Sequence, residues 1–293
     1  FKLEKNLYYY MACPGYKYTL SCCMNMKNEG KFLKEWLDHY IREGVEHFYL
    51  IDNGSTDNTM DIIKEYDNIT LFKDTRKYPN YQEAMLNDNL LPVIKESKWS
   101  MIVDADELMK GQNNHTIKSY IETIPNDIFG IYVIWKMFFN KTTDIPKMSD
   151  MKSRFNYNHL HNSSMELKEK GEGFWMFQYF MMFGKTLFRT ENLINLGIHT
   201  QSLGGKTIDN FGIDISGKME TIFESCNYVN ETSLKKANIV LNHYFIKTEQ
   251  EYLNRLKFVK NVWGVCNPRW CNGRQSWLKS LYNLDKKYVL LEN

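Results

Sequence analysis

The alternation of strand-like and helix-like patterns between residues 19 and 103 constrains the fold of this chain more than any other feature. Thr19–Met24, His47–Ile51 and Ile69–Phe72 are short apolar runs of the kind that form strands. Between the first two runs, apolar residues recur at helical spacing, at Phe32, Leu33, Trp36, Leu37, Tyr40 and Ile41. Strands and helices that alternate with short links form a parallel sheet with right-handed crossovers. We therefore predict an α/β fold in which a mostly parallel, Rossmann-type central sheet is flanked by helices.

Three carboxylates follow another strand-like run. Met101–Val103 is apolar and leads directly into Asp104-Ala105-Asp106-Glu107. The end of such a strand lies at the carboxyl edge of an open α/β sheet, where these sheets bind their ligands. Neighbouring carboxylates repel each other unless a cation or a proton lies between them, and Mg²⁺ and Mn²⁺ prefer oxygen ligands that they share with substrate phosphates. The sequence thus predicts a metal–diphosphate site here, with an acidic turn that ends the strand as the alternative.

Polar residues also follow the first two predicted strands. Asn28-Glu29 comes after the first strand, and Asp52 and Asp57 come after the second. Because the ends of parallel strands lie side by side, we expect these groups to converge on one crevice with the two later aspartates. Each group also has a local interpretation, with Asp57 as a helix N-cap and Asn53-Gly54 as a tight turn.

Composition and charge exclude several classes of protein. The formal net charge is only +2, which argues against nucleic acid as a partner. The longest apolar runs, Ile128–Trp135 and Phe174–Tyr179, are too short to span a bilayer, so membrane association is not indicated. Cys22 and Cys23 are adjacent within a predicted strand, which suits buried thiols in a reducing compartment. We expect a cytoplasmic protein, with the lumenal domain of an anchored Golgi-type enzyme as the alternative.

Several segments occur in an order and spacing typical of one group of enzymes. Up to the second strand they are Asn28-Glu29, Glu35–Tyr40, Gly44-Val45 and Tyr49–Asp57. Further along they are Gln82, Trp99, Asp104–Leu108 and an aromatic strand over Ile131–Phe139. Similar segments return at Lys185–His199 and Asn242–Thr248. This ordered set resembles the GT-A-fold glycosyltransferases, and the closest branch is that of the family 2 and family 92-like enzymes.

The resemblance implies a nucleotide-sugar donor, with Asp104-Ala105-Asp106 holding Mn²⁺ or Mg²⁺ against its diphosphate. A leaving nucleoside diphosphate gathers negative charge as the glycosidic bond breaks, and a divalent cation stabilises that charge. We expect Asp106 to be the direct ligand because it lies further out of the strand. Asp104 is then expected to reach either the ribose or a metal-bound water.

The resemblance also implies which residues form the donor pocket. Asp52 is expected near the base or the ribose, and Asn28 and Glu29 are expected at the rim of that pocket. Asp57 and Gln82 complete the set of expected donor-binding residues.

Two histidines further along are candidates for completing the metal site, as a downstream histidine does in many GT-A enzymes. His199 and His243 each follow an apolar segment, and an imidazole beside two carboxylates suits Mn²⁺. We favour His243 because Ile239–Leu241 is strand-like and returns this histidine to the sheet. The candidate phosphate partners are Lys185, Arg189 and Lys247.

An inverting transferase needs a carboxylate that takes the proton of the acceptor hydroxyl. The candidates are Asp209, Asp214 and Glu172. We favour Asp209 or Asp214, because neighbouring glycines indicate a loop of the kind that forms acceptor sites, with ordinary turn residues as the alternative. Phe174–Phe183 is almost wholly aromatic and methionine-rich, and it is either core or a platform for sugar rings.

We divide the chain into a lead-in (1–18), a donor half (19–140), an acceptor-side half (141–247) and a helical tail (248–293), within one continuous catalytic domain. Thr248 and Glu251 have the spacing of a capping box, and we expect the helix that they open to be structural.

Together these features lead us to hypothesise a metal-dependent glycosyltransferase. It would move a sugar from a UDP- or GDP-sugar to a glycan or a protein-linked hydroxyl, with inversion. One alternative is a non-catalytic module that binds nucleotide sugars or glycans. Another is a metal-dependent phosphodiesterase or nuclease, and the near-neutral charge argues against a nuclease because it offers no basic groove.

Overall fold

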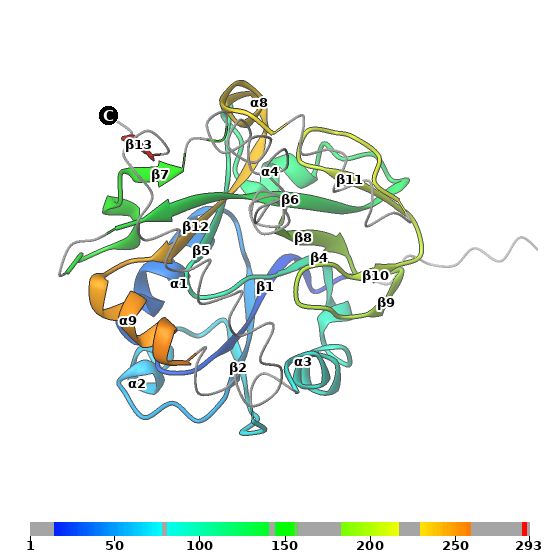
Figure 1. Ribbon diagram of the computed structural model, residues 1–293. Helices are drawn as coiled ribbons and strands as arrows, with labels where there is room; N and C mark the ends of the chain where they lie inside the picture. Colours follow the sequence, from blue (N-terminus) through cyan, green and yellow to red (C-terminus); the bar gives the residue numbers. More distant parts are fainter. Residues whose placement is uncertain are drawn as a thin grey trace, which may run out of the picture.

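The computed structural model describes residues 15–77, 81–140, 144–155, 157, 183–216, 229–258 and 289–291. Within these residues, one large mixed sheet runs through the molecule with helices on either side of it (Figure 1). The strands follow the order β13-β7-β6-β8-β4-β1-β2-β3; in addition, β11 and β12 pair with β6, and β5 pairs with β12. The predicted α/β fold class is confirmed.

The first half of the chain forms the parallel part of the sheet. Its strands are β1 (Tyr18–Met26), β2 (His47–Asp52), β3 (Ile69–Lys73) and β4 (Ser97–Ile102). β1 pairs in parallel with both β2 and β4, and β2 pairs in parallel with β3. All four strands therefore end at one edge of the sheet, as the alternating sequence pattern predicts.

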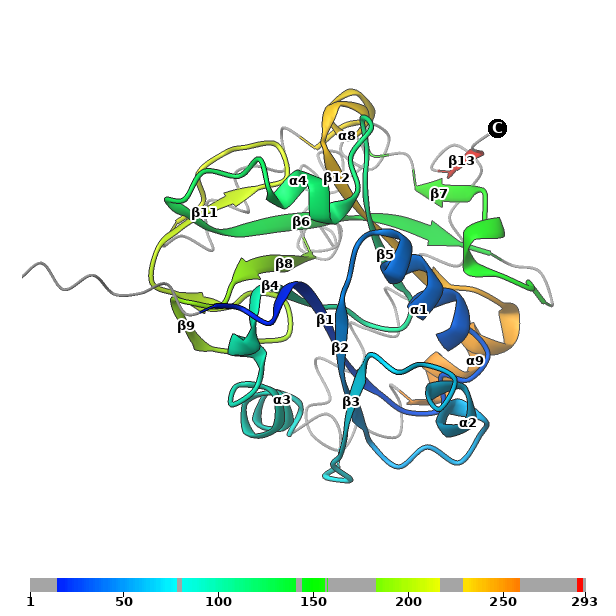
Figure 2. The ribbon, with the colours of Figure 1, turned by 180° about the vertical axis from the view of Figure 1, so that it is seen from behind.

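The helices of this half cover opposite faces of the parallel strands. Helices α1 (Leu33–Arg42) and α2 (Thr59–Ile63) lie on one side of these strands, and α3 (Gln82–Leu90) lies on the other (Figure 2). Cys22 packs in the core cluster that contains α1 and α2, whereas its neighbour Cys23 packs in the cluster that contains α3. Successive side chains of a strand point to opposite faces, so a strand covered on both faces is apolar throughout. Both cysteines are buried free thiols, as expected.

The second half of the sheet is organised along one long strand. β6 (Ile128–Phe139) pairs with β8 (Gly184–Arg189) and β11 (Lys206–Asp209) through its first part, and with β12 (Ile239–Ile246) through its last part. β8 runs antiparallel between β4 and β6 and joins the two halves of the sheet. β12 also pairs antiparallel with β5 (Glu107–Gly111), the strand that follows the two aspartates. This pairing places His243, in the middle of β12, opposite the first residue of β5.

The remaining elements are short. They are the 3-10 turns η1 (Ile94–Glu96) and η2 (Met148–Asp150), helices α4 (Ile117–Ile121), α8 (Glu231–Lys236) and α9 (Glu249–Phe258), and strands β7 (Ser153–Phe155), β9 (Leu193–Asn195), β10 (Ser202–Leu203) and β13 (Val289–Leu291). No helix in the described part of the chain is long and apolar enough to cross a bilayer. The predicted lead-in up to residue 14, most of the aromatic stretch Phe174–Phe183, Glu172 and most of the tail lie outside the described residues.

Candidate functional site

A cleft of about 970 Å³ opens where β1, β2, β3 and β4 end. This volume is of the size that binds a small-molecule ligand. Residues of the loops after β1, β2 and β3, with the start of α3, form one side, which we call the loop flank; it comprises Asn25–Glu29, Asn53, Thr75–Lys77 and Gln82. The remaining lining residues, which we call the carboxylate flank, are Asp104–Asp106, Trp135, Ile198-His199, His243, Phe245, Lys247, Glu251 and Arg255.

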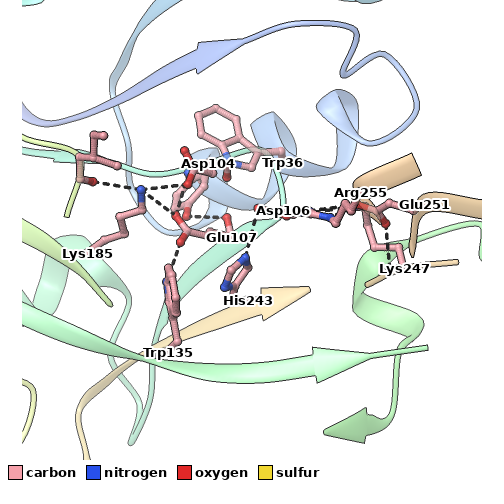
Figure 3. Close-up of polar contacts among 12 residues, drawn as sticks. Trp36, Asp104, Asp106, Glu107, Trp135, Lys185, His243, Lys247, Glu251 and Arg255 are labelled. Atoms are coloured by element: carbon pink, nitrogen blue, oxygen red, sulfur yellow. Dashed lines mark hydrogen bonds and ion pairs between the residues drawn. The ribbon is translucent and has the colours of Figure 1, made fainter. Parts of the chain in front are cut away.

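The two aspartates of the carboxylate flank lie in the tight connection between β4 and β5. The backbone amide of Glu107 donates to the carbonyl of Asp104 at 3.0 Å, and the Glu107 carboxylate accepts from the amide of Asp104 at 2.8 Å. The indole of Trp36, on α1, donates to the same Asp104 carbonyl at 3.1 Å. These bonds fix the backbone of the turn, which leaves the Asp104 and Asp106 side chains to face the cleft (Figure 3).

A buried lysine forms an ion pair with Asp104 from the interior of the protein. The Nζ atom of Lys185, on β8, lies 2.9 Å from Asp104 Oδ2 and 3.7 Å from Glu107 Oε2, and it donates to the carbonyl of Ile198 at 3.0 Å. Burial lowers the pKa of a lysine, but the charges of Asp104 and Glu107 outweigh burial and raise the pKa of Lys185. Lys185 therefore holds Asp104 from inside the protein, instead of facing the cleft as the predicted phosphate partner.

The second carboxylate, Asp106, is surrounded by cationic side chains and an imidazole. His243 Nε2 lies 3.5 Å from Asp106 Oδ1, while Arg255 donates to Oδ2 at 2.6 Å and Lys247 Nζ lies 3.8 Å from it. Burial alone would raise the pKa of Asp106, but His243, Lys247 and Arg255 hold this pKa well below its usual range. Asp106 is therefore an ionised carboxylate at neutral pH.

The strand pairing explains how His243 reaches this position. β12 places His243 directly opposite Glu107 on β5, one residue after Asp106, and the amide of Tyr244 donates to the Asp106 carbonyl at 2.7 Å. The expected return of His243 to the sheet beside the two aspartates is what the structure shows. His243 Nδ1 is buried and has no hydrogen-bond partner among the described residues.

Helix α9 contributes to the cleft, although we expected it to be purely structural. Glu251 accepts from Lys247 Nζ at 2.8 Å and from Arg255 at 3.1 Å, so it positions both cations beside Asp106. Thr248 Oγ1 accepts from the Glu251 amide at 3.1 Å, as a capping residue does. The sequence holds one signal for this role that we did not use, the Glu251–Arg255 pair at i, i+4 directly after Lys247.

The loop flank is held together by hydrogen bonds between neighbouring loops. Asn28 Oδ1 accepts from the amide of Thr56, and Asp57 Oδ2 accepts from the amide of Gly30, so the loop after β1 is tied to the loop after β2. Asp52 is buried, and its carboxylate accepts from the amide of Ser55 within its own loop. Neither Asp52 nor Asp57 lines the cleft, whereas Asn28 does.

Glu29 and Gln82 are the other predicted donor-binding residues, and both line the cleft. Gln82 is the first residue of α3. Burial, followed by the charge of Asp106, raises the pKa of Glu29 to about 7. Of the residues predicted for this crevice, the structure thus brings Asn28, Glu29 and Gln82 into one cleft with the two aspartates and His243.

The predicted bases lie elsewhere. Asp209 ends β11 and accepts from the amides of Phe211 and Ile213, each at 2.9 Å, and Asp214 is exposed and accepts from the amide of Ser216 at 2.9 Å. Neither lines the cleft, and these contacts favour the alternative interpretation of both as turn residues.

Arg189, a predicted phosphate partner, is also outside the cleft. It is buried and donates to the carbonyls of Ile128 and Ile124. Its guanidinium lies over the ring of Trp99, which indicates a structural role.

A divalent cation fits the chemistry of the carboxylate flank. Among the described residues, no three His, Cys, Asp or Glu side chains are placed so that they could together coordinate a metal ion. Mg²⁺ and Mn²⁺, however, are usually held by one or two carboxylates together with substrate phosphates, and imidazole is a good additional ligand for Mn²⁺. Asp106 Oδ1 and His243 Nε2 already face each other at 3.5 Å, and Asp104 lines the cleft beside them.

Comparison with known sequences identifies relatives of this chain. The family model described as glycosyltransferase family 92 matches residues 17–273. A glycosyltransferase family 92 protein of Ricinus communis is 29% identical over 93 residues, which are 31% of this chain and 16% of that protein. One of Oryza sativa subsp. japonica is 24% identical over 107 residues, which are 36% of this chain and 18% of that protein. The matched part thus spans less than a fifth of either plant relative.

Comparison with solved structures gives weaker matches. S. aureus TarS (residues 1–349), crystallised in complex with UDP, has a TM-score of 0.38 and 14% sequence identity, over 92% of this chain and 73% of that chain. A similarity of this size does not carry over the ligand of that protein.

Proposed function

Because the chain belongs to glycosyltransferase family 92, we propose that it transfers a sugar from a nucleotide-diphosphate donor to a hydroxyl acceptor in a metal-dependent, inverting reaction. The donor is a UDP- or GDP-sugar, and the acceptor is a glycan or a protein-linked hydroxyl. The observation that carries the proposal is the cleft itself, in which Asp104, Asp106 and His243 face the polar ends of the first three parallel strands.

The carboxylate flank provides what a diphosphate leaving group requires. A Mn²⁺ or Mg²⁺ ion held by Asp106 and His243, with Asp104 beside it, would stabilise the negative charge that develops on the leaving diphosphate. Lys247 and Arg255 line the same cleft and now pair with Asp106. Both cations can exchange this carboxylate for phosphate oxygens when a donor binds, because Arg and Lys pair well with either group.

The loop flank provides the place for the nucleoside. Asn28, Glu29 and Gln82 line it with hydrogen-bonding groups, and the loops that carry Asn28 and Glu29 are fixed to the loop after β2. A pocket whose walls are set before the ligand arrives loses less conformational entropy on binding. The loop flank therefore orients the donor, and the carboxylate flank stabilises the charge on the leaving diphosphate.

The experiment that tests the proposal compares wild-type protein with Asp106→Asn. Wild type is incubated with UDP- and GDP-sugars, with and without an acceptor mixture and with Mn²⁺ or a chelator, and release of free UDP or GDP is measured. We expect release that requires the metal, and a loss on the order of 10³-fold in Asp106→Asn, because a metal ligand stabilises the transition state by several kcal/mol. The matched control is Asp61→Asn, which changes an exposed carboxylate on α2 that pairs with Lys64 at 2.9 Å.

The products separate the proposed function from its alternatives. A binding-only module would show metal-dependent donor binding without release of any nucleotide. A phosphodiesterase would release nucleoside monophosphate and sugar phosphate in place of nucleoside diphosphate. Asp106→Asn protein that folds as wild type and still binds donor in a metal-dependent way would refute the assignment of Asp106.

A further inference from the structure

His199, the second histidine that we considered as a metal ligand, also lines the cleft. The loop between β9 and β10 carries it, and both its backbone and its neighbour are anchored: Thr186 Oγ1 donates to the His199 carbonyl at 3.0 Å, and Lys185 donates to the Ile198 carbonyl at 3.0 Å. Asn87 on α3 fixes the start of this loop through two hydrogen bonds with the backbone of Leu196. The His199 ring is therefore positioned by the sheet and by α3.

Hydrogen bonding determines which nitrogen of His199 carries the proton. Nδ1 lies 3.1 Å from the carbonyl oxygen of Gly184, and a carbonyl can only accept, so Nδ1 is the donor. A Cβ atom at Gly184 would lie only 2.1 Å from the Val133 carbonyl, so this backbone position depends on glycine. Burial, followed by the charge of Lys185, lowers the pKa of His199 to about 4, which keeps the ring neutral. The lone pair of His199 is consequently on Nε2, for which the described residues contain no hydrogen-bond partner.

The aromatic surroundings place His199 next to the reacting part of the cleft. Trp135 contacts both histidines, with ring centroids 5.5 Å from His199 and 4.3 Å from His243. Phe183 lies 5.0 Å from His199. The anomeric carbon of a nucleotide sugar is joined to the diphosphate through one oxygen, so it lies one bond beyond the group that the carboxylate flank binds. His199 lines the same cleft, and the indole of Trp135 contacts the rings of both His199 and the proposed metal ligand His243.

We propose that His199 Nε2 is the general base that deprotonates the acceptor hydroxyl. This inference rests on the proposed glycosyl transfer. The acceptor oxygen forms a bond to the anomeric carbon while the bond from that carbon to the phosphate oxygen breaks, and the leaving nucleoside diphosphate keeps the electron pair. The acceptor proton passes to Nε2, and the resulting imidazolium later returns it to water. The indole of Trp135, which lines the cleft beside the base, suits the apolar face of an acceptor sugar ring.

The other bases of the described cleft are less suited to this step. Asp104 is held by Lys185, and Asp106 and Glu251 are held by Arg255. Glu29 is the remaining carboxylate, and the charges that act on it are those of Asp106, Lys247 and Arg255, so it lies at the metal–diphosphate end of the cleft.

The sharpest test is His199→Asn, because the asparagine amide nitrogen can take the place of Nδ1 and keep the bond to the Gly184 carbonyl while Nε2 is lost. We expect kcat for transfer to fall by about 10² to 10⁴-fold, the range for a lost general base, while metal-dependent donor binding stays within about twofold of wild type. In His199→Ala, added imidazole should restore part of the activity. His115→Asn is the matched control, since this half-buried histidine bonds to Ser119 and does not line the cleft.

Two further variants separate this role from its competitors. His243→Asn should lose metal-dependent donor binding, and Glu29→Gln should change donor KM more than kcat. The inference is wrong if His199→Asn keeps the wild-type kcat, if it loses metal-dependent donor binding as His243→Asn does, or if imidazole fails to restore any activity to His199→Ala. Wild-type protein that transfers no sugar to any acceptor overturns the proposed function and this inference with it. Active wild type with unchanged His199 variants overturns the inference alone.

Discussion

On the loop flank of the cleft, polar side chains form hydrogen bonds with the backbone of neighbouring loops. On the carboxylate flank, charged side chains form ion pairs with one another. Asn53 illustrates the first kind, because its amide donates to the carbonyls of Asp74 at 2.6 Å and Arg76 at 2.8 Å. Asp106 illustrates the second, because its partners are Arg255, Lys247 and His243. A pocket that only orients a ligand needs fixed walls, while a pocket that stabilises changing charge needs ionic groups that can exchange partners.

The carboxylate flank is itself divided into a fixed part and an exchangeable part. Lys185 and Glu107 are 0% exposed, and both Glu107 oxygens accept hydrogen bonds, from the Asp104 amide and the Trp135 indole. Arg255, by contrast, keeps 33% of its side chain exposed to the cleft. The buried cation therefore supports the turn, and the exposed cation is available to a ligand.

The largest effect that the comparison predicts is on stability, in Lys185→Met. Removing one partner of a buried ionic group leaves the others uncompensated, so we expect the free energy of unfolding to fall by about 3 to 5 kcal/mol. Urea denaturation measures the loss. Lys206→Met is the control, because Lys206 and Asp214 lie 3.9 Å apart with side chains 42% and 54% exposed, and the loss there should stay below about 1 kcal/mol. Equal losses in both variants would show that Lys185 is not a buried support of Asp104.

The next effect concerns the exchangeable cation, in Arg255→Gln. If Arg255 moves from Asp106 to the donor diphosphate, the variant loses charged hydrogen bonds of about 1.5 to 3 kcal/mol, so donor KM should rise by about 10 to 100-fold with little change in stability. Steady-state kinetics with varied donor measures this. Lys257→Gln, on an exposed face of the same helix, should leave KM unchanged. A lower KM in Arg255→Gln would mean instead that Arg255 competes with the metal for Asp106.

The sequence predicts the strand ends of this cleft well, because each is encoded locally by an apolar run followed by polar residues. The same rule predicts the return of His243, since Ile239–Leu241 is a plain strand pattern that must pair somewhere in the sheet. The sequence does not determine which of the polar residues at a strand end faces the cleft. Asp52 and Asn53 are adjacent, yet Asp52 is buried in its own turn and Asn53 lines the cleft.

Residues whose role depends on distant partners could not be predicted. Arg255 is 149 positions from Asp106 in the chain, and nothing in its own helix indicates that partner. Lys185 was expected to bind phosphate. The sequence could not show that its ammonium group pairs with Asp104 and Glu107 inside the protein instead. Asp209 and Asp214 have the local pattern of a ligand-binding loop, and the same pattern forms ordinary turns.

The smallest predicted effect tests the loop flank, in Asn53→Ala. The variant loses two hydrogen bonds that join the loop after β2 to the loop after β3, so the free energy of unfolding should fall by about 1 to 2 kcal/mol. Donor KM should rise only a few-fold, because the loop that carries Arg76 loses its anchor. Thermal unfolding and donor kinetics measure the two quantities. The control for stability alone is Asn89→Ala, which removes two hydrogen bonds, one to the carboxylate of Asp74 and one to the Met85 carbonyl. Metal dependence should be identical to wild type, because no charge of the carboxylate flank has changed. If Asn53→Ala altered the Mn²⁺ requirement, the two flanks would act as one coupled unit, and the division between orientation and charge stabilisation would have to be given up.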